Sequence, residues 1–270
     1  MPEFVARNQA EASGDRAGAL GGAGPARVPE VSWPREMLEA DPEAAAGAFD
    51  RAIQGLARRL PASEAARFLF ALDSALYARL GAAAIAAEGE RGEALHPKHR
   101  LTQYHEFFLT RIGAGERVAD LGCGNGALAL DIARVCGARV VGVDMSAQTV
   151  EMARARASAE DAGRGSAEFV CANIMDIAAD EVCPGVDGMF DVIVLSNVLE
   201  HLTNRPLTLR ALAARLRVTR LLIRVPAFER DWRAAYKRDL GVEWRLDPTH
   251  EVEHTQEELA AEILAAGLQI

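Results

Sequence analysis

The pattern of apolar positions changes its period near residue 113, and this change divides the chain. Before it, apolar side chains recur every three or four residues, as in the series Phe49, Ile53, Leu56 and Leu60, which predicts helices. After it, short continuous apolar runs alternate with helical stretches. Continuous runs are typical of strands that are buried on both faces of a parallel sheet. The second part of the chain is therefore expected to be an α/β domain.

Five strands are predicted in this second part, and helical stretches follow the first, the second and the fourth of them. The alternation predicts a doubly wound, mostly parallel, Rossmann-like sheet with helices on both faces. The capping box that begins at Thr255 opens a last helix, which Gly267 ends. The expected strands are Arg117–Leu121, Arg139–Asp144, Ala167–Ala172, Phe190–Ser196 and Arg220–Val225.

Three regions follow from this pattern. Residues 1–33 mix Ala, Gly, Glu and Pro without a hydrophobic period and are expected to be a flexible tail. Residues 34–95 are expected to form a helical cap region, in which Asp41 caps a helix that has Pro42 at its first position. This region is interpreted as a cap or as a dimerisation element, so a homodimer stays open. Residues 96–270 form the α/β domain.

Composition and charge argue against several classes of function. Half of the residues are hydrophobic and the net charge is −9, which argues against a general binder of nucleic acid or membrane surfaces. The N-terminus lacks a basic start followed by an apolar run, and the apolar stretch 80–87 is far too short to span a bilayer. The four cysteines form no CxxC pair. We expect a cytoplasmic protein with free thiols.

A glycine turn follows the first predicted strand. Gly122, Gly124 and Gly126 let the backbone adopt positive φ and approach a ligand closely, and Asp144 ends the next strand. This pattern also fits a dinucleotide-binding fingerprint. Asp120 argues against a dinucleotide, because a carboxylate at this strand end would repel a pyrophosphate. It would suit a ligand with an ammonium and a sulfonium group.

Four motifs occur in order, each at a strand end: VADLGCGNG, VVGVDMS, FVCANIMDI and FDVIVLSNVLEHL. On these motifs the chain resembles the class I S-adenosylmethionine-dependent methyltransferases, strongly over residues 104–202 and weakly to residue 267. Within the class, HPKHRLTQYHEFF is similar to a segment of bacterial small-molecule or saccharide methyltransferases. The resemblance implies that S-adenosyl-L-methionine is the cofactor. It also implies a sixth and a seventh strand, for which the chain leaves only three residues after Gly267, so these strands look truncated.

The resemblance implies a set of cofactor-binding residues at the strand ends. In the family pattern, the first motif holds the methionine moiety, the second holds ribose and adenine, the third holds adenine, and the fourth lines the pocket below the sulfonium. A residue of the preceding helix closes the pocket. In that order, the residues of this chain are Asp120, Gly122 and Gly124, then Asp144 and Met145, then Asn173 and Ile174, then Ser196 and Asn197, and finally Tyr104.

Transfer to a hydroxyl acceptor requires a base that removes the proton, and histidine suits this task near neutral pH. His250 lies in the loop before the last helix and is the first candidate; His201, after the fourth strand, is the second. His201 is also interpretable as a pocket-wall residue. No metal site is expected, because His96, His99 and His105 have poor spacing for one.

The segment 228–245 is basic and aromatic within an acidic chain. We weigh two interpretations equally: a lid in which Arg230, Arg233 and Arg238 meet an anionic or saccharide acceptor, and an amphipathic surface helix. Nucleic acid is not expected as the acceptor, since SNVL stands where amino-methylating enzymes carry a Pro-Pro-Tyr motif.

The expected function is methyl transfer from S-adenosylmethionine to a small molecule or saccharide, through oxygen and with a histidine base. Two rival hypotheses are a nicotinamide-dependent (NAD(P)) oxidoreductase and a non-catalytic, cofactor-binding partner subunit. Asp120 and the Glu200–His201 pair speak against the first, and the full set of pocket residues speaks against the second.

Overall fold

The computed structural model describes residues 3–8, 41–90, 97, 101–159, 163–178, 185–186 and 188–270. These residues form two compact units, which we describe separately. The larger unit contains the sheet and comprises residues 1–11, 95–230 and 247–270. The smaller unit comprises residues 12–94 and 231–246.

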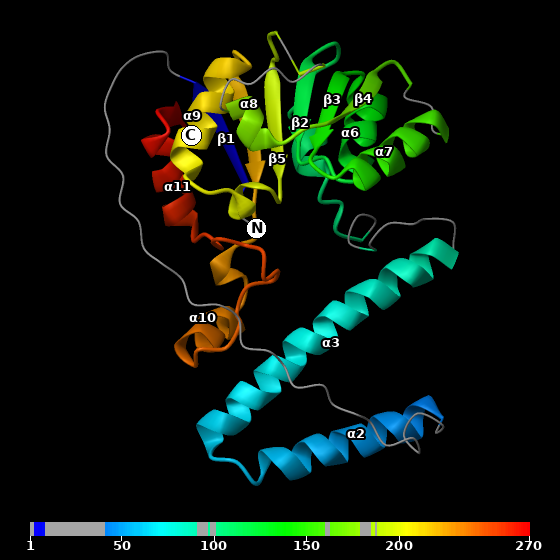
Figure 1. Cartoon of the computed structure of the whole chain (residues 1–270), viewed down its shortest axis with the longest axis vertical. Helices are drawn as coiled ribbons and strands as arrows, with labels where there is room; N and C mark the ends of the chain where they lie inside the picture. Colours follow the sequence, from blue (N-terminus) through cyan, green and yellow to red (C-terminus); the bar gives the residue numbers. More distant parts are fainter. Residues whose placement is uncertain are drawn as a thin grey trace. The chain divides into compact units, whose positions relative to one another are not determined.

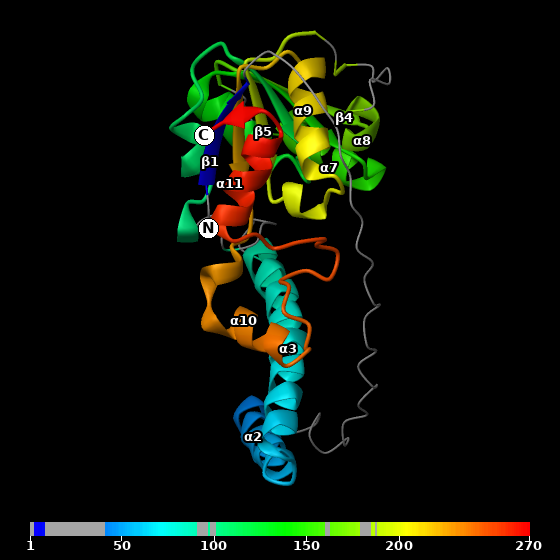
Figure 2. The same ribbon diagram turned by 90° about the vertical axis from the view of Figure 1, so that its left-hand side faces the viewer.

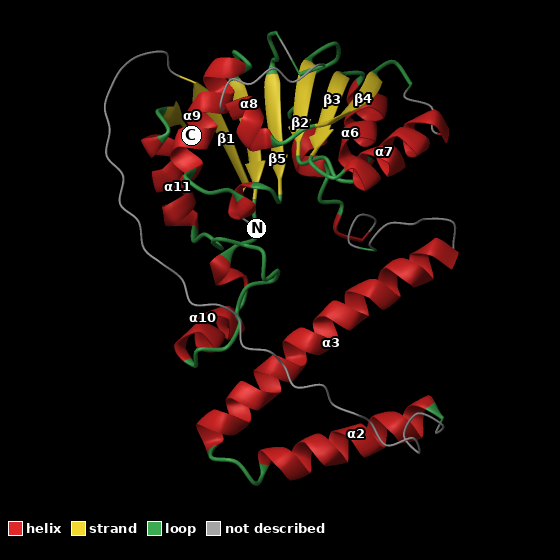
Figure 3. Ribbon diagram, viewed as in Figure 1, coloured by secondary structure: helices red, strands yellow, loops and turns green. Residues whose placement is uncertain are grey.

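The larger unit is a seven-stranded sheet in the order β4-β3-β2-β5-β6-β1-β7 (Figures 1 and 3). The first five strands in this order are parallel to one another, which confirms the predicted doubly wound sheet. Their bounds lie within two residues of those expected from the apolar runs. The strands are β2 (Arg117–Leu121), β3 (Arg139–Asp144), β4 (Ser166–Cys171), β5 (Val192–Ser196) and β6 (Arg220–Arg224).

Alternate residues of the central strands face two separate hydrophobic cores. Ala119 and Leu121 of β2 pack in one core with helices α8 (Ile174–Ala178), α9 (Arg205–Arg215) and α11 (Gln256–Ala265). Val118 packs in the other with α5 (Glu106–Leu109), α6 (Ala127–Asp131), the π-helix Ile132–Cys136 and α7 (Ala147–Ala159). Because strand side chains alternate between faces, both faces need apolar cover, and this explains the continuous apolar runs.

The sheet edge next to β6 is formed by two short strands that the apolar pattern did not predict. The short strand β7 (Leu268–Gln269) does form, and β1 (Glu3–Asn8) lies between β6 and β7, antiparallel to both. Figure 2 shows β1 beside α11 at this edge. The last strand is thus only two residues long, and the edge of β6 is covered by β1. Residues 3–8 are also not a flexible tail, since their backbone pairs with β6, whereas residues 9–33 of that predicted tail lie outside the described residues.

The smaller unit contains three helices in its described part. Helix α2 (Pro42–Ala57) begins as predicted, with the Asp41 carboxylate accepting the amides of Glu43 and Ala44. Helix α3 (Ala62–Glu90) follows, and α10 (Trp232–Asp239) comes from the basic, aromatic segment. By length and composition alone α3 is apolar enough to cross a bilayer, although one such helix is weak evidence.

Helix α10 packs on α3 within this unit. Phe70 of α3 makes edge-on ring contacts with Trp232 and Tyr236, and the ammonium of Lys237 lies 2.9 Å from a carboxylate oxygen of Asp73. Two segments that lie far apart in the sequence are thereby joined in one unit. The aromatic residues of α10 are accounted for by this packing.

Candidate active site

The glycine turn between β2 and α6 is closely packed against the segment that follows β5. Gly122 has a φ of +77°, and a Cβ at this position would lie 2.4 Å from Cγ2 of Val198. The amides of Gly122 and Cys123 both donate to the carbonyl of Val143, at 2.7 and 2.9 Å. Only glycine satisfies both the backbone angle and the close approach. The turn is thus fixed at the carboxyl edge of the sheet, where ligands bind in open α/β sheets.

A pocket of about 190 Å³ lies on this turn. It brings together five of the residues predicted to bind the cofactor, including Tyr104 from the segment before α5 and Ser196 from the end of β5. The predicted members of its lining are Tyr104, Asp120, Gly122, Gly124 and Ser196, and the others are Cys123, Asn125, Ala127 and Leu128.

Asp120 is the charged residue of this pocket and is 1% exposed. None of the described residues gives its Oδ2 atom a hydrogen bond. Burial, and then the nearby carboxylate of Asp144, raise the pKa of Asp120 to about 7. A buried carboxylate without a donor is costly, and a cationic ligand group would remove that cost. The prediction that Asp120 meets a positively charged ligand therefore fits this environment.

Asp144, at the end of β3, holds the turn from the other side. One of its oxygens accepts the amide of Gly124 at 3.0 Å and the other accepts the amide of Ser146 at 2.9 Å. Each carboxylate oxygen has a second lone pair, so both can still accept a ribose hydroxyl. Met145 beside it is 74% exposed, which leaves its side chain open to a flat ligand face.

The remaining predicted residues lie at neighbouring strand ends. Asn173 caps α8, because its Oδ1 accepts the amide of Met175 at 2.9 Å, so the oxygen expected to meet adenine already takes part in one hydrogen bond. Ile174 is buried at the start of that helix. Asn197 has a φ of +56°, and no described residue hydrogen-bonds its buried Oδ1.

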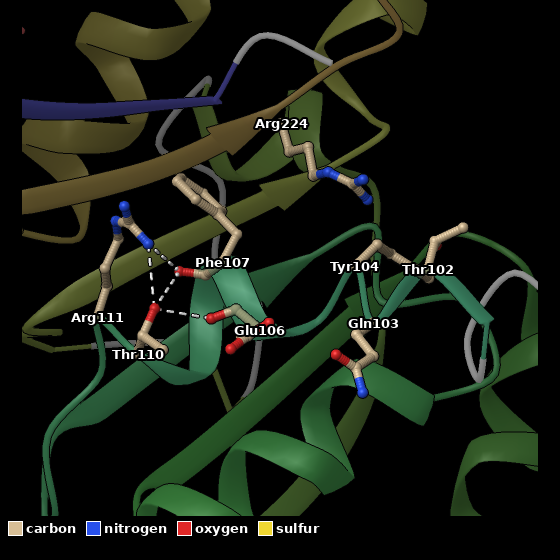
Figure 4. Close-up of a pocket in the computed structure, with 8 residues that line it drawn as sticks. All are labelled: Thr102, Gln103, Tyr104, Glu106, Phe107, Thr110, Arg111 and Arg224. Carbon is tan, nitrogen blue, oxygen red and sulfur yellow. Dashed lines mark hydrogen bonds between the residues drawn. The ribbon is translucent and has the colours of Figure 1, made fainter.

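A second pocket, of about 340 Å³, shares Tyr104 with the first (Figure 4). The guanidinium of Arg224, at the end of β6, lies 4.6 Å from the centre of the Tyr104 ring. The other wall is formed by α5 and the residues around it, with Arg111 and Thr110 joined by a hydrogen bond. Burial raises the pKa of Tyr104 well above its usual range, so its hydroxyl stays protonated. The ring of Tyr104 therefore separates two hollows at the same edge of the sheet.

The two histidines predicted as bases lie together, although they come from separate segments of the chain. The rings of His201 and His250 are 4.7 Å apart at 77°. Nδ1 of His250 lies 3.0 Å from Oε1 of Glu253, which is fully buried on its side chain and also binds the guanidinium of Arg230. Nδ1 of His201 lies 3.1 Å from the hydroxyl of Thr249.

Glu200 completes this group and is fully buried. Burial raises the pKa of Glu200 to about 7, and its own backbone amide and then His250 oppose that shift in part. Within the described part of the chain, Glu200, His201 and His250 form the one group of this kind that could hold a metal ion, with ligand atoms all within 4.8 Å of one another. The expectation of no metal site considered His96, His99 and His105. The first two lie outside the described residues, and His105 binds Asp131 at 2.7 Å.

Sequence reasoning missed the partners of these histidines. Glu253 and Thr249 lie in an irregular loop without a hydrophobic period, and their proximity to His250 in the sequence was the available signal.

Two of the arginines predicted to meet an anionic acceptor bind carboxylates of the chain itself. Arg230 binds Glu253 and Arg233 binds Asp231, so two of the three are engaged by carboxylates.

Residues 118–220 match the family model of a methyltransferase domain. A ubiquinone biosynthesis O-methyltransferase of Neisseria meningitidis serogroup C is 35% identical over 99 residues, which cover 37% of this chain and 39% of the relative. A ribosomal protein L11 methyltransferase of Thermotoga neapolitana is 33% identical over 112 residues, 41% of this chain and 37% of the relative.

Among solved structures, the small RNA methyltransferase HEN1 is 19% identical, with a TM-score of 0.51 over 62% of this chain and 21% of that chain. This likeness concerns the fold. The chain spans about two fifths of the length of the two curated relatives given above. The family match covers the strands and turns that carry the predicted cofactor site. Residues 118–220 of this chain are therefore similar to a methyltransferase domain, as the motifs predicted.

Proposed function

We propose that this chain transfers the methyl group of S-adenosylmethionine to an oxygen atom of a small-molecule or saccharide acceptor. The observation that carries the proposal is the group Glu200, His201 and His250 beside the glycine turn. Val198, two residues before Glu200, packs against Gly122 of that turn. Groups that can handle the proton of a hydroxyl therefore follow closely in the sequence after the residue that packs on the turn, which supports an acceptor close to the methyl donor.

The pocket on the turn fits the cofactor. When bound, S-adenosylmethionine supplies a methyl group that its sulfonium has already activated. Asp120 would hold the ammonium of the methionine part, because its buried Oδ2 has no hydrogen bond from the described residues. Asp144 would accept the ribose hydroxyls. Ser196 and Asn197 would line the wall at the sulfonium, and Tyr104 would exclude water from the opposite side.

His250 would remove the proton of the acceptor, with His201 as the second candidate. The carboxylate of Glu253 at Nδ1 fixes the orientation of the ring, as carboxylates do for catalytic histidines. Nε2 would then face the hydroxyl. Burial and the neighbouring His250 lower the pKa of His201, so His201 stays neutral near pH 7. An ordinary hydroxyl needs such a base, because it holds its proton at neutral pH.

The acceptor class is inferred from the net charge and from the motif at the end of β5. One of the two curated relatives is named for ubiquinone biosynthesis and the other for ribosomal protein L11, so the shared domain does not decide the acceptor class. The acidic net charge and the lack of a Pro-Pro-Tyr motif at β5 support a small molecule over a nucleic acid.

The experiment measures transfer of a labelled methyl group by the purified chain to a panel of hydroxylated small molecules and saccharides, with matched amines beside them. Binding of S-adenosylhomocysteine by calorimetry is the first readout, and tight NAD binding in its place would favour an oxidoreductase. We expect His250→Asn to lower kcat by about 10²–10⁴-fold while S-adenosylhomocysteine binding changes less than about twofold. Glu251→Gln, on an exposed neighbour, is the matched control and should retain both.

Transfer to the amines alone would contradict an oxygen acceptor. Full activity of His250→Asn would remove the base from the proposal. Cofactor binding without transfer to any member of the panel would favour a non-catalytic partner subunit.

A further inference from the structure

Glu200 carries a buried carboxylate beside two imidazoles. The residue is 0% exposed, and neither carboxylate oxygen receives a hydrogen bond from any described residue. A fully buried ionised carboxylate in this state is unfavourable, as any unpaired buried ion is. Buried charges in proteins are paired or coordinate metals. The side chain of Glu200 therefore points to a missing positive partner.

Two imidazoles stand beside this carboxylate, from segments far apart in the sequence. The ligand atoms of Glu200, His201 and His250 all lie within 4.8 Å of one another. Ligands of one ion with bonds of about 2.0–2.2 Å lie roughly 3–4 Å apart, which is within this limit. No hydrogen bond among the described residues joins Glu200 to either ring. The three groups are therefore within reach of one common ion, and the carboxylate of Glu200 forms no hydrogen bond with either ring.

The outer partners of the two rings support the same conclusion. Nδ1 of His250 is held by Glu253 at 3.0 Å, and Nδ1 of His201 by Thr249 at 3.1 Å. Metal-binding histidines characteristically use one ring nitrogen for such a carboxylate or oxygen partner, which orients the other nitrogen. Glu253 is in turn fixed by Arg230. The rings are thus oriented before any ligand arrives.

We propose that Glu200, His201 and His250 bind a divalent first-row transition-metal cation. Two imidazoles and one carboxylate suit Zn²⁺, Fe²⁺ or Mn²⁺ better than Mg²⁺ or Ca²⁺, which prefer oxygen ligands throughout. His201 is exposed, so the site is open to solvent on one side and retains positions for an oxygen of the acceptor. The cation would thereby place the acceptor next to the cofactor pocket that Ser196 lines.

The catalytic part of this inference rests on the proposed function, whereas cation binding does not. A bound cation lowers the pKa of a hydroxyl that coordinates it. The acceptor proton then leaves to water, the oxygen–methyl bond forms, and the methyl–sulfur bond breaks. His250 acts as a ligand in this scheme and no side-chain base is needed. The cation thus replaces the base role of His250 given above.

Cation binding is tested by titrating the full chain, freed of metal with a chelator, with Mn²⁺ and Zn²⁺, and with Mg²⁺ for comparison. Calorimetry and the rise in Tm measure binding, and the electron paramagnetic signal of Mn²⁺ counts the bound ions. We expect one ion per chain, with Mn²⁺ or Zn²⁺ bound at least about tenfold more tightly than Mg²⁺. Glu200→Gln and His201→Ala should each weaken binding by more than about tenfold.

Glu251→Gln is the matched control, because it removes the same charge from the same neighbourhood outside the group. Since Glu200→Gln is close in shape and His201 is exposed, both variants are expected to fold, which circular dichroism checks. Lack of binding by the wild-type chain at about 1 mM cation, the concentration of a weak site, would overturn the proposal. So would equal affinity in the wild type and both variants.

Activity separates this proposal from the proposed function. Loss of methyl transfer in chelator, with recovery on adding Mn²⁺ or Zn²⁺, supports methyl transfer and the catalytic cation, and it overturns the base role of His250. Transfer that is unaffected by chelator yet lost in His250→Asn retains the proposed function with a histidine base and overturns the catalytic cation. Cation binding at the group without binding of S-adenosylhomocysteine retains the cation and overturns the methyltransferase activity.

Discussion

Asp120 and Glu200 are buried carboxylates, one in β2 and the other just after the neighbouring strand β5, and each lacks a hydrogen bond from the described residues to at least one oxygen. Their different neighbours assign them different ligands. Asp120 borders the glycine turn and the carboxylate of Asp144, which suits the ammonium of the cofactor. Glu200 borders two imidazoles, which suits a metal ion. The groups around a buried carboxylate thus indicate which ligand it binds.

Cofactor binding should depend on pH through Asp120. Its pKa of about 7 means that the ionised fraction rises from roughly a tenth at pH 6 to about nine tenths at pH 8. If only the ionised form holds the ammonium, the affinity for S-adenosylhomocysteine should rise about tenfold over this interval. Calorimetry at several pH values measures it, and Asp120→Asn should bind weakly at all of them. Identical pH profiles for the wild type and Asp120→Asn would contradict the assignment.

The raised pKa of Asp120 also affects the stability of the protein without cofactor. The folded-state pKa of Asp120 lies above its ordinary value of 3.8, so folding favours the protonated form. This contribution to stability is fully present below about pH 4 and is lost as the pH rises through about 7. Cofactor binding should therefore raise the Tm more at pH 8 than at pH 6.

At the scale of elements, the β2–α6 turn depends on glycine for two separable reasons. Gly122 combines positive φ with close packing on Val198, whereas Gly115 has a similar φ of +79° and no atom within 4 Å of the place that a Cβ would take. Replacing both in turn by alanine separates backbone strain from packing, because only Gly122 also approaches a neighbour.

We expect Gly115→Ala to cost about 1–2 kcal/mol in the free energy of unfolding, from the backbone alone. Gly122→Ala should cost about 1–3 kcal/mol more, from the contact with Val198, and should weaken S-adenosylhomocysteine binding by over about tenfold. Chemical denaturation and calorimetry measure the two effects. Equal losses of stability and affinity in both variants would contradict a specific role for the turn.

Local patterns predicted most of these elements. The strands β2 and β3 and the caps at Asp41 and Thr255 follow from apolar runs and from single residues. The packing of α10 on α3 does not, because it depends on Phe70 and Lys237, which lie far apart in the sequence. The approach of Glu253 to His250 was missed for another reason: hydrogen-bonding loops have no periodic signal.

At the scale of the whole chain, the sheet is completed by its first strand. Composition alone assigned residues 3–8 to a tail, since so short a strand carries little signal and its pairing with β6 is set by residues near the other end of the chain. The strand β7 is shorter than any pattern can show. The parallel part of the sheet was thus predictable, and its antiparallel edge was not.

Deleting residues 2–8 should expose the unpaired edge of β6, and an open strand edge promotes aggregation. We expect a fall in Tm of several degrees, about 2–4 °C for each kcal/mol lost, and more light scattering on heating. Deletion of residues 17–23, an equally long stretch of the expected tail, is the control. A Tm unchanged by the first deletion would show that β1 contributes nothing to stability.

The position of β1 also constrains the order in which this protein is made. On the ribosome, residues 3–8 emerge early, yet their partner Arg220–Arg224 appears only after more than two hundred further residues have been synthesised. The parallel strands can pair as they emerge, whereas β1 must wait and then close a very long loop. A segment synthesised early is therefore among the last to find its place, and until then the edge of β6 is accessible to chaperones and to other nascent chains.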